Sequence, residues 1–74
     1  MMTNGSHYSM VIEWSNEDHT YIVSFPEWGD ITHTHGDSYE EAVRHGCEVL
    51  DDLIAIWQQQ GRSLPEPRVF AASA

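Results

Sequence analysis

Three side chains with metal-binding chemistry occupy every second position of one short segment: His33, His35 and Asp37. In an extended strand, alternate side chains point to the same face, so the two imidazoles would lie roughly 6.6 to 7 Å apart. Two imidazoles and a carboxylate can hold zinc and leave one coordination position open for a hydrolytic water. Because a fourth ligand and a supporting shell are not evident, a polar strand that faces solvent is the favoured interpretation.

Carboxylates are a second candidate for chemistry, since ribonuclease-H-like enzymes bind two magnesium ions with a cluster of acidic side chains. Four acidic residues fall in a predicted strand or in the loops near it: Glu13, Glu27, Asp30 and Asp37. Acidic residues are so abundant in this chain that such coincidences are expected. Cys47 has no evident base nearby and is interpreted as a packed thiol rather than a nucleophile. We therefore predict no enzymatic activity and no cofactor.

The charge balance bears on the kind of partner. Twelve acidic residues face three arginines and no lysine, which gives a formal net charge of −9. Phosphate backbones are bound by clustered Lys and Arg, so direct nucleic-acid binding is not expected, whereas a basic protein would be attracted. An acidic domain without such a partner is the plainer alternative. A single cysteine allows no internal disulfide, and neither a signal peptide nor a membrane span is evident, so we expect a cytoplasmic protein.

Three strands are predicted to form the framework. Alternating apolar residues indicate a strand over residues 7–14 and a second over residues 20–25, which ends at Pro26 because proline has no N–H to donate. Residues 31–35 return as a third strand, which makes an antiparallel meander with one apolar face. Residues 1–6 are expected to be disordered. Trp28, in the loop between the second and third strands, is explained equally well as an interface anchor or as a core residue.

A helix that begins at Tyr39 is predicted to cover the apolar face of the meander. Ser38 is a natural N-cap, and Glu41 three residues later completes a capping box. Apolar positions recur at three- and four-residue steps as far as Trp57, while most carboxylates fall on the other side. Gly61 stands where a C-terminal cap belongs. A short fourth strand over residues 69–72 follows, which predicts an α+β fold of order β-β-β-α-β.

This order resembles the HicB family of antitoxins from bacterial and archaeal toxin–antitoxin pairs. The matching motifs are the strand end Phe25-Pro26, the turn Gly36-Asp37-Ser38, the pair Glu41-Ala42 after the cap, and Gly61 after the helix. The resemblance implies a partial ribonuclease-H-like fold with a single antitoxin domain over residues 7–72. Many family members carry a C-terminal DNA-binding domain, which we do not expect here, and whether any operator binding remains without it stays open.

The resemblance implies that the chain binds and neutralises a small basic RNA-cleaving toxin, HicA, by covering its active or RNA-binding surface. We predict that acidic residues of the helix and the loop tryptophan make the contact: Trp28, Glu48, Asp51 and Asp52. The alternative is an orphan HicB-like oligomeric interaction module without a toxin partner. In both cases strand edges stay exposed, so we expect a homodimer or a larger homo-oligomer formed through an edge or through residues 68–72.

Overall fold

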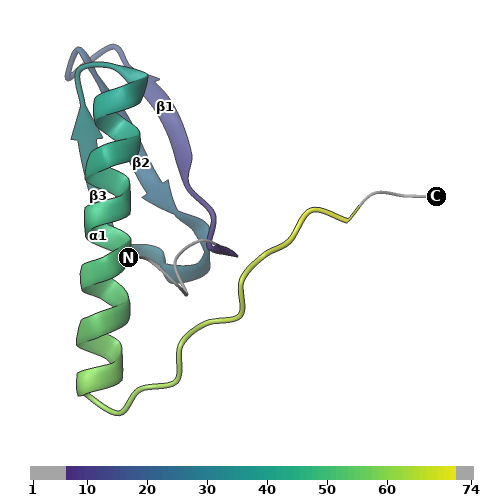
Figure 1. Ribbon diagram of the computed structural model, residues 1–74. Helices are drawn as coiled ribbons and strands as arrows, with labels where there is room; N and C mark the ends of the chain where they lie inside the picture. The colour runs from purple at the N-terminus through teal and green to yellow at the C-terminus, as the bar shows by residue number, and fades with distance from the viewer. Residues whose placement is uncertain (1–6, 72–74) are drawn as a thin grey trace.

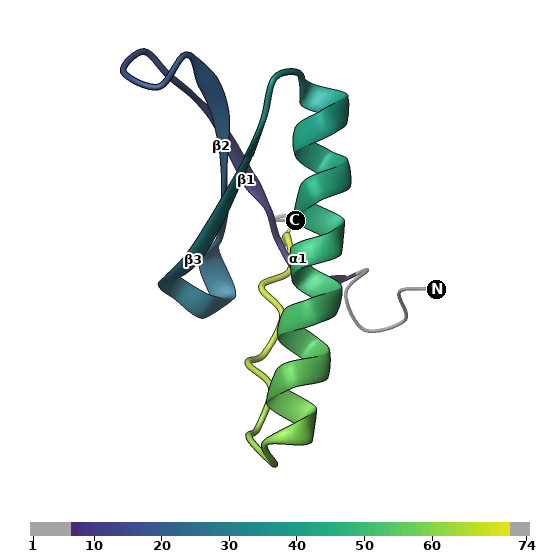
Figure 2. The ribbon, with the colours of Figure 1, turned by 90° about the vertical axis from the view of Figure 1, so that its left-hand side faces the viewer.

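The computed structural model describes residues 7–71, which form one three-stranded sheet covered on one face by a long helix (Figures 1 and 2). The elements in chain order are the strands β1 (Val11–Ser15) and β2 (Thr20–Phe25), a 3₁₀ turn η2 (Pro26–Trp28), the strand β3 (Gly29–Gly36) and the helix α1 (Tyr39–Gln59). The strands lie in the order β1-β2-β3 and both pairs are antiparallel. The predicted meander with one packed helix is thus confirmed.

The first strand begins at Val11 rather than at residue 7, where the sequence placed its start. Val11 already pairs with Ser24, so earlier residues would have to face the end of β2 at Pro26. Proline donates no ladder hydrogen bond, and the chain turns there into η2. Ser9 therefore has no strand partner, and its N–H donates instead to the carboxylate oxygens of Glu27, at 3.1 and 3.2 Å.

The third strand is longer than predicted and ends where the chain comes very close to the helix. A side chain at Gly36 would lie against the backbone nitrogen and Cα of Ala42, so only glycine fits at the end of β3. The hydroxyl of Thr20, at the start of β2, donates a hydrogen bond to the Gly36 carbonyl at 2.8 Å. This bond fixes the end of β3 to the start of β2. The approach places the first turns of α1 directly against the sheet.

The predicted capping box forms at the start of α1. The Ser38 hydroxyl accepts the Glu41 N–H at 3.1 Å, and the Glu41 carboxylate accepts the Asp37 N–H at 2.6 Å. In the usual form of the box, the glutamate would bond to the backbone of the N-cap itself, which here is Ser38. The hydrogen bond from Asp37 lowers the pKa of Glu41, since it stabilises the carboxylate form.

The end of α1 is closed by glycine, as the sequence predicts. Gly61 has a φ of +68°, a conformation that glycine adopts without strain. The Gly61 N–H donates to the Gln58 carbonyl at 3.1 Å and the Arg62 N–H to the Trp57 carbonyl at 2.9 Å. These two bonds are the pattern of a Schellman motif. The guanidinium of Arg62 lies over the Trp57 ring, 3.8 Å from its centroid.

The core lies between the sheet and α1. Its buried apolar residues come from β2, η2 and the helix: Val23, Phe25, Trp28, Ala42, Leu50 and Ile54. Trp28 is only 4% exposed, and its ring packs against those of Tyr8 and Trp57, with centroid distances of 4.6 and 6.1 Å. Of the two interpretations of Trp28, the structure therefore favours a core residue, because the ring is not available on the surface of the chain.

The predicted fourth strand is not formed over residues 69–71; Ala72 and residues 1–6 lie outside the described part of the chain. After α1, the tail packs back across the body, where the Tyr8 hydroxyl donates to the Pro65 carbonyl at 2.7 Å and the Arg68 N–H to Glu27 at 2.8 Å. Beyond Arg68 the chain leaves the body (Figure 1). A strand needs a neighbour to accept its backbone hydrogen bonds, and these residues have none in residues 7–71.

Candidate functional site

The outward side of α1 carries the acidic residues that the sequence singled out. The buried side is a stripe at four-residue steps: Ala42, Gly46, Leu50 and Ile54. An α-helix turns by about 100° per residue, so a residue two positions away from Leu50 lies opposite this stripe. Glu48 is two positions before Leu50, and Asp52 is two positions after it. Asp51 lies on the flank beside them. All three carboxylates are exposed, and we call Glu48, Asp51 and Asp52 the acidic face.

The acidic face is not neutralised by the chain itself. Within residues 7–71, the only ion pair joins Arg44 to Glu41, with 3.8 Å between the guanidinium and the carboxylate. Glu48 and Asp52 are four residues apart on the helix, so they are neighbours of like charge, which costs about 0.2–0.5 kcal/mol. A helix that keeps such a pair presents negative charge to any cationic surface that approaches it.

An exposed aromatic row, which the sequence analysis missed, lies beside the start of α1. The Tyr21 ring packs against Trp14 and Tyr39, with centroid distances of 5.1 and 4.5 Å. Tyr39 and Val43 line an open groove of about 520 Å³. Both are large hydrophobic side chains that are exposed on the surface of the helix. The three- and four-residue spacing counts Val43 as a core position, but the buried stripe follows four-residue steps from Ala42 and leaves Val43 42% exposed.

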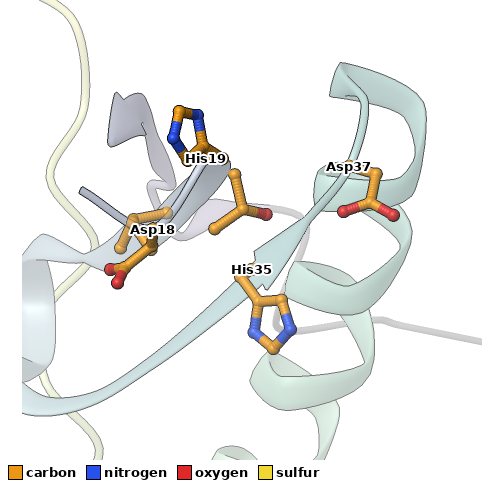
Figure 3. A pocket seen from close by; sticks show the side chains of 6 residues that line it. Asp18, His19, His35 and Asp37 are labelled. Carbon is orange, nitrogen blue, oxygen red and sulfur yellow. The ribbon is translucent and has the colours of Figure 1, made fainter. Parts of the chain in front are cut away.

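His35 and Asp37 lie at the opposite end of the meander from η2, beside an open hollow of about 410 Å³ (Figure 3), whereas His33 pairs with Ser24, closer to η2. The labelled side chains that line the hollow are Asp18, His19, His35 and Asp37, and they do not converge: the two imidazoles point in opposite directions. His33 does not line this hollow. Across the described residues, no three His, Cys, Asp or Glu side chains form a group that could hold a metal ion. The structure therefore gives the zinc hypothesis for His33, His35 and Asp37 no support.

His35 has a structural contact through its backbone. The His45 ring lies at the edge of β3, where its Nδ1 is 2.6 Å from the His35 carbonyl oxygen. A carbonyl oxygen only accepts, so His45 carries its proton on Nδ1 in this contact. The bond ties α1 to the exposed edge of the sheet.

The carboxylates considered for a two-metal site are also kept apart. Glu27 accepts hydrogen bonds from the N–H of Ser9, from the Ser9 hydroxyl at 3.0 Å and from the N–H of Arg68. Partial burial acts to raise the pKa of Glu27, but the N–H donors of Arg68 and Ser9 outweigh it, and the pKa is lowered overall. Glu27 thus stays ionised and joins three segments: η2, the residues before β1 and the tail after α1. We call this set of hydrogen bonds the Glu27 clamp. Glu13 is exposed on β1, Asp30 is exposed on β3, and Asp37 lies between β3 and α1, so the four carboxylates form no metal-binding group among the described residues.

Comparison with protein-family models, curated proteins and solved structures gives no match for this chain. The resemblance to HicB antitoxins therefore stays a prediction that depends on the motifs themselves. Within residues 7–71, no helix has the length and apolar character needed to cross a membrane. The function must accordingly be argued from the surface that the fold presents.

Proposed function

We propose that this chain is an antitoxin-like protein that neutralises a small basic RNA-cleaving toxin of the HicA type. It would act by covering the toxin's active or RNA-binding surface. The observation that carries the proposal is the acidic face of α1, where Glu48, Asp51 and Asp52 are exposed and have no ion-pair partner in the described residues. The motif resemblance supplies the kind of partner.

Inhibition of this kind follows from simple electrostatics. A protein that cleaves RNA holds the phosphate backbone with Lys and Arg side chains. A row of carboxylates on a rigid helix competes for the same cations, and the 21 residues of α1 extend about 30 Å. Complementary charge speeds association and selects the partner more than it raises affinity. The mechanism requires no catalytic group on this chain, since occupying the toxin's surface is sufficient.

A partner can be identified by capture from the host. The tagged chain is incubated with host extract at moderate salt, which suppresses loose binding to an acidic surface, and bound proteins are identified by mass spectrometry. A small basic protein at near-equal stoichiometry is expected, and its RNA-cleaving activity should disappear when this chain is added. Recovery of the chain alone would contradict the proposal and favour the orphan oligomeric module.

The acidic face itself is tested with two matched triple variants. Glu48→Gln, Asp51→Asn and Asp52→Asn remove the acidic face. Glu17→Gln, Asp30→Asn and Glu66→Gln remove three exposed carboxylates elsewhere, so both triples change the net charge by three units. The first triple should weaken partner binding about tenfold or more and flatten its salt dependence, and the second should do so much less. Equal effects would mean that total charge, and not this face, attracts the partner.

A further inference from the structure

The tail after α1 is held beside the start of β1. Glu27 binds both Ser9, two residues before β1, and Arg68 of the tail. The Ser9 hydroxyl also lies 3.4 Å from the Arg68 carbonyl oxygen. Two segments 59 positions apart in the sequence are thus fixed side by side, and Arg68 marks the point where the tail leaves the body.

The residues after Arg68 are apolar and exposed. Val69 is 72% exposed and Phe70 is 92% exposed. No backbone hydrogen bond involving residues 69–71 is formed within the part of the chain that the structure describes. In Figure 1 this segment points away from the sheet. Valine and phenylalanine favour strands, where their side chains pack on a pleated surface, but here they contact solvent.

The nearest strand, β1, has an edge without a partner. It pairs with β2 on one side, and on the other side no strand follows among residues 7–71. Such an edge presents unpaired N–H and C=O groups to any extended segment. Val11 and Trp14 are partly exposed on this strand, and Glu13 is its only charged residue.

We propose that two copies of this chain form a symmetric dimer in which residues 69–71 of each copy add as a strand to the free β1 edge of the other. One chain carries both the extended segment and the edge. A two-fold arrangement therefore pairs both segments with both edges at once and closes the assembly at two copies. The tail does not lie along its own β1, because it diverges from the body after Arg68 (Figure 1).

The charge distribution permits this contact between two copies. A chain with a net charge of −9 repels its own copies over most of its surface. Residues 69–71 carry no charge, β1 carries one carboxylate, and the preceding Arg68 is one of only three arginines. The acidic face lies on the side of α1 away from the sheet, so it stays free in the dimer. The inference is therefore independent of the proposed toxin partner.

The test measures the mass of the assembly by sedimentation equilibrium over micromolar concentrations. The full chain should form a dimer. A chain that ends after Arg68, and the full chain with Phe70→Asp, should each lower the association constant at least tenfold. Ile31→Asp is the matched control, because Ile31 is an exposed apolar residue on β3, at the other edge of the sheet, with 62% of its surface exposed. It should leave the dimer intact. Circular dichroism checks that each variant keeps the fold.

Hydrogen exchange locates the interface in the same samples. The amides of residues 69–71 and those of residues 11–15 that point away from β2 should be protected in the full chain. The latter should lose protection in the shortened chain, while β3 stays unchanged. A full chain that remains monomeric would overturn the proposal. This includes the case in which residues 69–71 are protected because they pair with β1 of the same chain. A dimer that survives shortening but is lost in Ile31→Asp would place the interface at β3 and overturn it as well.

Discussion

The substitution Glu27→Gln tests how much the Glu27 carboxylate stabilises the fold by binding the segments around Ser9 and Arg68. The Glu27 oxygens accept hydrogen bonds from the Ser9 N–H and hydroxyl and from the Arg68 N–H. Glutamine keeps one acceptor oxygen, while its NH₂ group donates, so at least one of these donors loses its partner. A hydrogen bond to a charged group contributes about 1.5–3 kcal/mol. Glu27 is half-buried, so water compensates part of the loss, and we expect a decrease of about 1–2 kcal/mol in the free energy of unfolding.

The effect should depend on pH in a defined direction. Partial burial raises the pKa of Glu27, but the hydrogen bonds from Arg68 and Ser9 outweigh it and hold this pKa below its usual value in the folded chain. The native state therefore favours the charged form, and the stabilisation is fully present above the unfolded pKa. It is lost as the pH falls through the lower, folded pKa. The difference between the native chain and Glu27→Gln should accordingly be largest near neutral pH and shrink below about pH 4.5.

Urea unfolding followed by circular dichroism measures both quantities, at a concentration low enough to avoid self-association. For a domain of this size, 1 kcal/mol corresponds to about 4–8 °C in Tm, so thermal scans are a second readout. Glu66→Gln is the control, because Glu66 is an exposed carboxylate of the same tail; its effect should stay within about 0.5 kcal/mol. Equal effects of the two substitutions, or a Glu27 effect that persists at acidic pH, would refute the Glu27 clamp.

Four further variants separate folding from binding. Gly36→Ala should destabilise the chain by about 1–3 kcal/mol in urea unfolding, because its Cβ would meet the helix backbone; an unchanged midpoint would disprove the close approach. Ser38→Ala removes the N-cap and should cost about 1 kcal/mol, measured in the same way. Trp28→Ala should cost about 3–5 kcal/mol and abolish the thermal transition, whereas an unchanged Tm would return Trp28 to the surface. Glu48→Gln with Asp52→Asn should raise stability by about 0.2–0.5 kcal/mol while it weakens binding of a captured partner; a loss of stability would contradict the repulsion.

The parts of the fold that local signals encode were predictable from the sequence. The capping box at Ser38, the glycine after α1 and the four-residue apolar stripe act within one or two helical turns, so the chain needs no distant partner to reveal them. The alternation in β2 placed its bounds correctly, and Pro26 marked its end. The acidic residues of α1 were assigned to the outward side for the same reason, since a helical period fixes both sides together.

The features that the sequence did not reveal depend on segments far apart in the chain. The start of β1 is fixed by where β2 ends, and the fourth strand is absent because residues 69–71 pair with neither free edge of their own sheet. Trp28 is buried in part because Tyr8 and Trp57, which are distant in the sequence, pack against it. Glu27 looked like one loop carboxylate among many, and its role appears only when donors 18 and 41 residues away are brought to it.

The acidic face illustrates why function can be tested on this small domain without disturbing its fold. A chain of this length buries only about 60% of its unfolded surface, so each core residue is needed for stability. Loss of binding in a variant of Phe25 or Trp28 would follow from unfolding alone. Glu48 and Asp52 lie opposite the buried stripe, and their mutual repulsion slightly opposes helix formation. Because their removal acts on stability and on partner binding with opposite signs, a weaker complex formed by a more stable chain cannot be explained by unfolding.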